Sequence, residues 1–100
     1  MDSTINLLLT STNYFQWKSH MEDLLRSKGL YQITLEKEKS PNDDDKKVKW
    51  DNKSDEARGL IGMSISPDLR FHLKEINDPD EAWENLNLTL VNTILFKHIS

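Results

Sequence analysis

The segment from Asn13 to Ile33 constrains the fold most, because it carries the start, the apolar face and the stop of one helix. Asn13 is a favourable N-cap residue, and Gln16 stands three residues later, where the partner of a capping box belongs. Gly29 suits the left-handed backbone conformation that ends many helices. Apolar residues at steps of three and four share one face between these signals: Tyr14, Trp17, Met21, Leu24 and Leu25. This segment therefore predicts an amphipathic helix with a further apolar stretch after it.

A second helix is predicted from about Asp44 to Ser64, after a helix-breaking Ser-Pro-Asn run. The triplet Asp43-Asp44-Asp45 favours a helix start, because carboxylates stabilise the positive end of the helix dipole. Five residues mark the buried side of this helix: Trp50, Ala57, Leu60, Ile61 and Ile65. Gly59 and Gly62 either weaken the helix or permit close approach of another one. We expect the N-terminal half to be solvated and the C-terminal half to join the core.

Two proline-containing starts predict two further helices. The Ser66-Pro67 pair fits the N-cap and first position of a short helix that packs Leu69 and Leu73 inward, with Phe71 as a third candidate for that face. The Asp78-Pro79 pair repeats this arrangement, and Glu81 completes a D-x-x-E capping box. The inward residues of this last helix are Ala82, Trp83 and Leu86. Residues 87–100 show weak helical and weak strand patterns, and the sequence assigns them no element.

The first twelve residues precede all of these helices and end in a cluster of hydroxyl side chains that favours a turn. Their apolar residues are Ile5, Leu7, Leu8 and Leu9, a patch too short for a signal-peptide core. We expect an extended arm that packs onto the domain. The predicted fold is therefore all-α, a small bundle of about four helices (13–86) with an arm (1–12) and a divergent tail (87–100).

Three tryptophans fall on the apolar faces of three different predicted helices. We expect Trp17, Trp50 and Trp83 to meet in one shared core, because large rings dominate the burial of a small domain. The full set of predicted core residues is Tyr14, Trp17, Met21, Leu24, Leu25, Leu30, Trp50, Ala57, Ile61, Leu69, Leu73, Trp83 and Leu86.

Charge and composition narrow the classes of function. The chain has 100 residues, which suits one small domain, and a formal net charge of −4. This charge argues against direct nucleic-acid binding, which usually needs a basic face. The absence of cysteine excludes disulfides and thiolate metal sites. No apolar run approaches the roughly 20 residues that span a bilayer, so no membrane partner is expected.

Catalytic and metal-binding patterns are missing from the sequence. The three histidines, at positions 20, 72 and 98, are widely separated and lack metal-ligand spacing. The aspartate triplet fails the calcium-loop pattern, since Ser54 occupies the twelfth position where glutamate is required. No serine lies in a nucleophile-elbow context, and no glycine-rich phosphate loop is present. We therefore expect a protein that is not an enzyme and uses no cofactor.

Three blocks of residues together resemble a known family. The first block reads Asn13-Tyr14-Phe15-x-Trp17, then Met21, Leu24-Leu25 and Gly29-Leu30-Tyr31; the second is Trp50 with Asp55-x-Ala57 and Ile61; the third is Ala82-Trp83-x-x-Leu86. Their order and approximate spacing are similar to the N-terminal Gag segment of plant copia-type LTR retrotransposons, over about Leu9 to Leu86. Two positions depart from that pattern, because Ser11 replaces a usual glycine and Tyr31 a frequent tryptophan.

This resemblance implies a structural protein, a truncated or domesticated Gag fragment that holds the first capsid lobe. Such lobes self-associate weakly in cytoplasmic particles, while RNA packaging relies on basic tails and a zinc knuckle. Neither of these is found in this sequence, so little nucleic-acid binding is expected. The candidate interface residues are Phe15, Lys18, Glu22 and Phe71.

A second interpretation stays open beside the first. Related Gag-derived lobes can hold a short extended peptide or protein segment in a hydrophobic groove. In this chain the arm residues Ile5, Leu7 and Leu9 would fill or guard such a groove. The two interpretations differ in the position of the arm. An arm docked in a groove between helices favours a binding module, whereas a disordered arm on a surface without a groove favours assembly.

Overall fold

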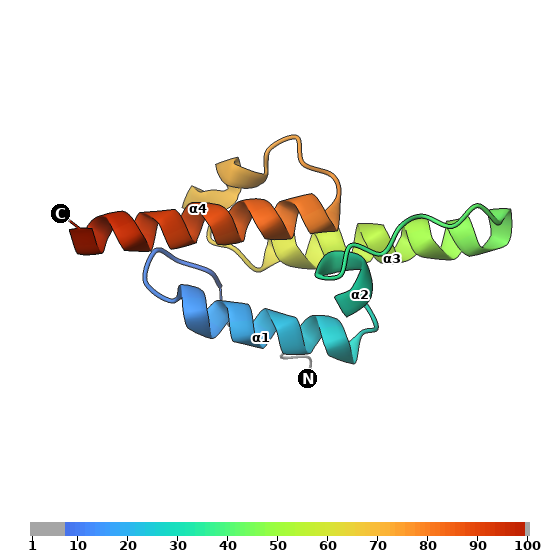
Figure 1. Ribbon diagram of the computed structural model, residues 1–100, viewed down its shortest axis with the longest axis horizontal. Helices are drawn as coiled ribbons and strands as arrows, with labels where there is room; N and C mark the ends of the chain where they lie inside the picture. Colours follow the sequence, from blue (N-terminus) through green and yellow to red (C-terminus); the bar gives the residue numbers. More distant parts are fainter. Residues whose placement is uncertain (1–7, 100) are drawn as a thin grey trace.

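The computed structural model describes the backbone of residues 8–99 and the side chains of residues 8–93. The fold is all-α, as the sequence predicts, and the described residues form no strand. Figure 1 shows α1 below α4 and part of α3 behind α4. The N-terminal half of α3 and the C-terminal half of α4 project at opposite ends. The elements are α1 (Tyr14–Ser27), α2 (Tyr31–Thr34), α3 (Asp44–Met63), the 3₁₀ helix η1 (Pro67–Leu73) and α4 (Pro79–Ile99).

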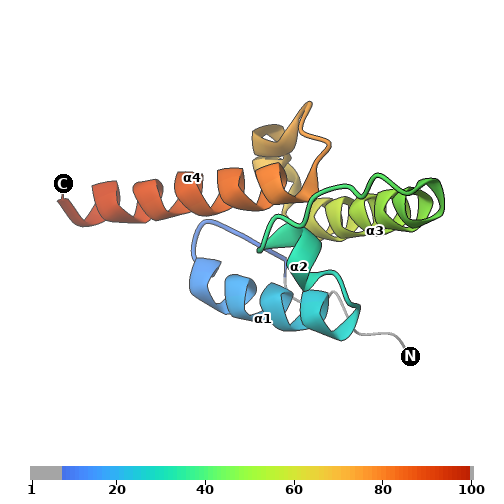
Figure 2. The same ribbon diagram turned by 45° about the vertical axis from the view of Figure 1, so that its right-hand side comes forward.

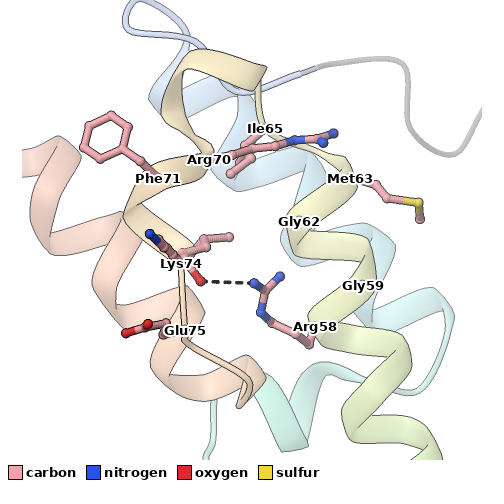
Figure 3. A pocket seen from close by; sticks show the side chains of 10 residues that line it. Arg58, Gly59, Gly62, Met63, Ile65, Arg70, Phe71, Lys74 and Glu75 are labelled. Carbon is pink, nitrogen blue, oxygen red and sulfur yellow. Dashed lines mark hydrogen bonds between the residues drawn. The ribbon is translucent and has the colours of Figure 1, made fainter.

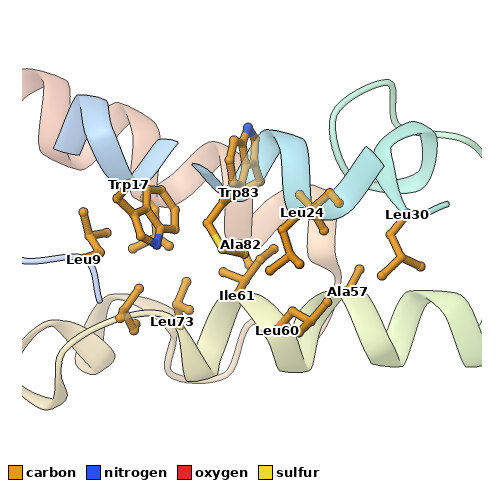
Figure 4. Packing of buried hydrophobic residues seen from close by; sticks show 14 of the residues in the cluster. Leu9, Trp17, Leu24, Leu30, Ala57, Leu60, Ile61, Leu73, Ala82 and Trp83 are labelled. Carbon is orange, nitrogen blue, oxygen red and sulfur yellow. The ribbon is translucent and has the colours of Figure 1, made fainter. Parts of the chain in front are cut away.

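One cluster of buried apolar side chains joins all five elements (Figure 4). At its centre Trp17 of α1 stacks on Trp83 of α4, with ring centroids 5.4 Å apart. The indole N–H of Trp17 donates to Oγ of Ser64 at 3.2 Å, so the buried polar atom of the ring has a partner. The predicted core residues that the structure buries are Tyr14, Trp17, Met21, Leu24, Leu25, Leu30, Ala57, Ile61, Leu73, Trp83 and Leu86.

Trp50 corrects the prediction of three tryptophans in one core. It is only partly buried and packs against the edge of the cluster, away from the Trp17–Trp83 stack. Its indole N–H donates to the backbone carbonyl of Glu38 at 3.2 Å. The reason is its place in the N-terminal half of α3, where residues 37–40 and the start of α4 lie beside it in place of the central stack. Leu69 of η1 is likewise partly buried at the edge.

The start of α1 differs from the predicted capping box. Asn13 precedes the helix, but its side chain caps no helical N–H. Its Oδ1 instead accepts from the backbone N–H of Thr10 at 2.8 Å, and its Nδ2 donates to the carbonyl of Leu8 at 2.7 Å. Asn13 therefore fixes the turn that joins the arm to α1. At the other end Gly29 has φ +72°, the left-handed conformation that the sequence predicts.

The described part of the arm is docked onto the end of α3. Leu9 is fully buried and forms a parallel bridge with Ile65. Its N–H donates to the carbonyl of Ser64 at 2.7 Å, and its carbonyl accepts from Ser66 at 3.0 Å. The other two predicted arm residues, Ile5 and Leu7, lie outside the described residues.

The last helix is longer than the sequence indicates. α4 continues past Leu86 to Ile99, so the described part of the predicted tail extends this helix (Figure 2). Leu90 is buried and Val91 packs against the core, so core contacts stabilise one further turn of the helix after Leu86. The pattern fails in the sequence because asparagine and threonine interrupt it and the apolar residues follow no single face.

Replacement of Gly59 by alanine is expected to stabilise the protein. A Cβ at this exposed position in α3 would meet nothing within 4 Å, so only the entropic advantage of alanine remains. The expected gain is about 0.5–1 kcal/mol, measured as a higher urea midpoint. Gly29→Ala is the contrast, because its positive φ should make the same change destabilising by about 1 kcal/mol. Equal shifts in both variants would contradict this reasoning.

Candidate functional site

A groove of about 540 Å³ runs between α1, α2 and α4. Its floor is formed by the apolar and aromatic parts of Tyr14, Tyr31, Leu35, Trp83, Leu88 and Val91. α1 approaches α2 closely with its backbone, and it reaches α4 through the Trp17–Trp83 ring stack. Large side chains thus hold α1 and α4 apart and leave the groove between their outer faces.

Tyr14 ties the two walls of this groove together. Its hydroxyl donates a hydrogen bond to Oδ1 of Asn87 on α4, and the Asn87 amide donates to the carbonyl of Trp83 at 2.6 Å. Burial raises the pKa of the Tyr14 phenol, and the nearby carboxylate of Glu22 raises it further. The phenol therefore stays protonated near neutral pH and remains a donor to Asn87.

The rim of the groove carries both signs of charge. Lys37 donates to the carboxylate of Glu84 at 2.7 Å, and this hydrogen bond raises the pKa of its ammonium group. Lys18 and Glu22 of α1 are partly buried along the opposite wall. Two further carboxylates, from Glu36 and Asp80, make the rim acidic on balance.

The predicted interface residues occupy three different places. Lys18 and Glu22 line the groove. Phe15 is 69% exposed at the start of α1, where its ring meets Tyr14 edge-on with centroids 5.0 Å apart. Phe71 is 67% exposed on η1 and lines a different hollow. The sequence did not indicate Tyr31, Leu88 or Val91 as groove residues, because only the continuation of α4 brings the last two there.

A second hollow, of about 560 Å³, opens between the C-terminal half of α3 and η1 (Figure 3). Gly59 and Gly62 lie along this hollow. No backbone of another helix lies within 4 Å of a Cβ built at either glycine, which corrects the interpretation that they permit close approach of another helix. A Cβ at Gly62 would lie 2.8 Å from Nη1 of Arg58, so the glycine leaves room for that guanidinium group. The lining residues of this hollow and those of the groove are entirely different.

The part of the chain that the structure describes contains no group of three or more histidine, aspartate or glutamate side chains placed to hold a metal ion. Among the same residues, no helix is both long and apolar enough to cross a bilayer.

Comparisons with protein-family models, curated proteins and solved structures found no match for this chain. The functional argument therefore depends on the residues and surfaces described above.

Proposed function

We propose that this chain is a non-enzymatic Gag-like capsid lobe that mediates self-association during assembly of cytoplasmic retrotransposon particles. The observation that supports this proposal is the groove between α1, α2 and α4, which combines an aromatic floor with a rim of both charges. The partner is a second copy of the same chain, and the association is weak.

The charge distribution of the rim favours a second copy. In a two-fold interface the same patch meets itself, so a patch with both signs of charge can pair its lysines with carboxylates of the other copy. Lys18 and Lys37 supply the positive charges, and Glu22, Glu36, Asp80 and Glu84 supply the negative ones. The excess of carboxylates leaves some repulsion across the interface, which keeps the association weak and dependent on salt.

Leu88→Glu should weaken self-association at least tenfold. Leu88 is 58% exposed on the groove floor, and full burial of a leucine contributes about 1.5–3 kcal/mol. A glutamate there adds a further carboxylate to an already acidic rim. Sedimentation velocity over a concentration series measures the change, and the wild type is expected to pass from monomer towards dimer.

Val48→Glu is the matched control for this variant. Val48 is 60% exposed on the projecting half of α3, and its replacement changes the net charge by the same amount. Its association should equal that of the wild type. Equal sedimentation of all three proteins at every concentration would refute the proposed groove interface.

A domesticated peptide-binding or protein-binding module is the second candidate function. The docked arm favours it, because Leu9 already adds an extended segment beside Ile65. A wild type that stays monomeric at every concentration, yet binds an added peptide in the groove, would support this candidate over self-association.

A further inference from the structure

The hollow between α3 and η1 concentrates positive charge in an acidic chain. Arg58, Arg70 and Lys74 line it, against a single carboxylate from Glu75, while the whole chain has a net charge of −4. Figure 3 shows that Arg58 comes from α3 and Arg70 from η1, while Lys74 directly follows η1. The local charge is therefore opposite in sign to that of the molecule.

These cations keep free hydrogen-bonding capacity. Arg58 uses Nε for the carbonyl of Ile76 at 2.6 Å and Nη2 for the carbonyl of Leu73 at 3.3 Å, which fixes its guanidinium group. Its Nη1 faces the open side of Gly62. Among the side chains of residues 8–93, neither Arg70 nor Lys74 forms an ion pair, and both are exposed. The hollow thus offers one rigid and two adjustable cationic donors.

Apolar surface lies directly beside these donors. Ile65 and Leu73 are buried beneath the hollow, so its exposed apolar surface comes from Met63 and Phe71, which are 54% and 67% exposed at its margins. Methionine side chains adapt to irregular partners, and aromatic rings supply large contact area at small entropic cost. A ligand that bears charge alone would leave this surface uncovered.

We propose that this hollow binds a short acidic peptide segment of a partner protein, in which carboxylates flank a large apolar side chain. The apolar side chain packs against the exposed Met63 and Phe71, and the carboxylates pair with Arg58, Arg70 and Lys74. Three cations in a chain of net negative charge are few for a nucleic-acid site, which favours the peptide. This site is separate from the proposed self-association groove, so either can fail without the other.

The test uses the full chain and a fluorescein-labelled peptide that alternates glutamate with leucine and phenylalanine. Fluorescence anisotropy should show saturable binding that weakens as salt is raised. The double variant Arg70→Glu/Lys74→Glu should bind at least tenfold more weakly, because attraction becomes repulsion at two contacts. Both residues are exposed, so circular dichroism should show an unchanged fold.

The double variant Lys49→Glu/Lys53→Glu is the matched control, since both lysines are exposed on α3 outside the hollow and the change in net charge is identical. It should retain binding within about twofold, because exposed charges at this separation are screened. Equal weakening by both double variants, or no saturable binding by the wild type, would overturn the proposal. Tighter binding of an RNA oligonucleotide than of the peptide would also overturn it. A loss of dimer in Arg70→Glu/Lys74→Glu would assign the hollow to a second copy instead.

Discussion

Trp17→Ala is expected to lower the free energy of unfolding by about 3–5 kcal/mol. The ring is fully buried, stacks on Trp83, and donates to Ser64, so its removal leaves a cavity and an unpaired hydroxyl acceptor. Small domains lie near the lower end of the usual range of unfolding free energies, about 5 kcal/mol, so a loss of this size removes most of the stability. Urea titration followed by far-UV circular dichroism measures the effect, and much of the variant should be unfolded without denaturant.

Trp50→Ala provides the internal comparison for this prediction. Trp50 is partly buried at the edge of the cluster, so its truncation should cost clearly less than that of Trp17. Trp17→Phe keeps an aromatic ring against Trp83 and should fall between the two. If Trp50→Ala destabilised the protein as much as Trp17→Ala, the claim that Trp50 lies outside the central Trp17–Trp83 stack would be wrong.

Leu9→Ala is expected to cost about 2–5 kcal/mol, the second largest effect. Leu9 is fully buried although it lies in the arm, where its backbone also pairs with Ser64 and Ser66. The substitution therefore reports whether the arm is part of the folded core. Thermal melts measure the change, at about 4–8 °C per kcal/mol for a domain of this size.

The neighbouring Leu8 is the control for the arm, since its side chain is 41% exposed. Leu8→Ala should change the free energy of unfolding by no more than about 0.5 kcal/mol. A melting temperature for Leu9→Ala equal to that of Leu8→Ala would show that the arm does not dock as described.

The helix positions could be predicted because their signals are local. The apolar spacing of α1, the acidic start of α3 and the proline at the start of α4 each specify an element within a few residues. The four-residue helix α2 was missed, because a single turn has no periodic pattern to read. The continuation of α4 was missed because burial of Leu90 overrides the weak propensities around it.

The surfaces were much harder to predict than the helices. Lys18 and Glu22 are adjacent on one helix, so their shared position on α1 followed from spacing. The groove itself needs the distance between α1 and α4, which the packing of Trp17 and Trp83 determines. The hollow between α3 and η1 is lined by both Arg58 and Arg70, and no local pattern indicates that these two residues share one surface. Tertiary packing therefore determines both surfaces.

The most direct test of self-association through the groove is an NMR dilution series of the full chain. We predict that amide signals of the groove residues Lys18, Glu22, Tyr31 and Leu88 shift together as concentration rises, while those of Arg58 and Arg70 stay constant. Concentration-independent spectra, or shifts confined to the hollow between α3 and η1, would contradict the proposed interface.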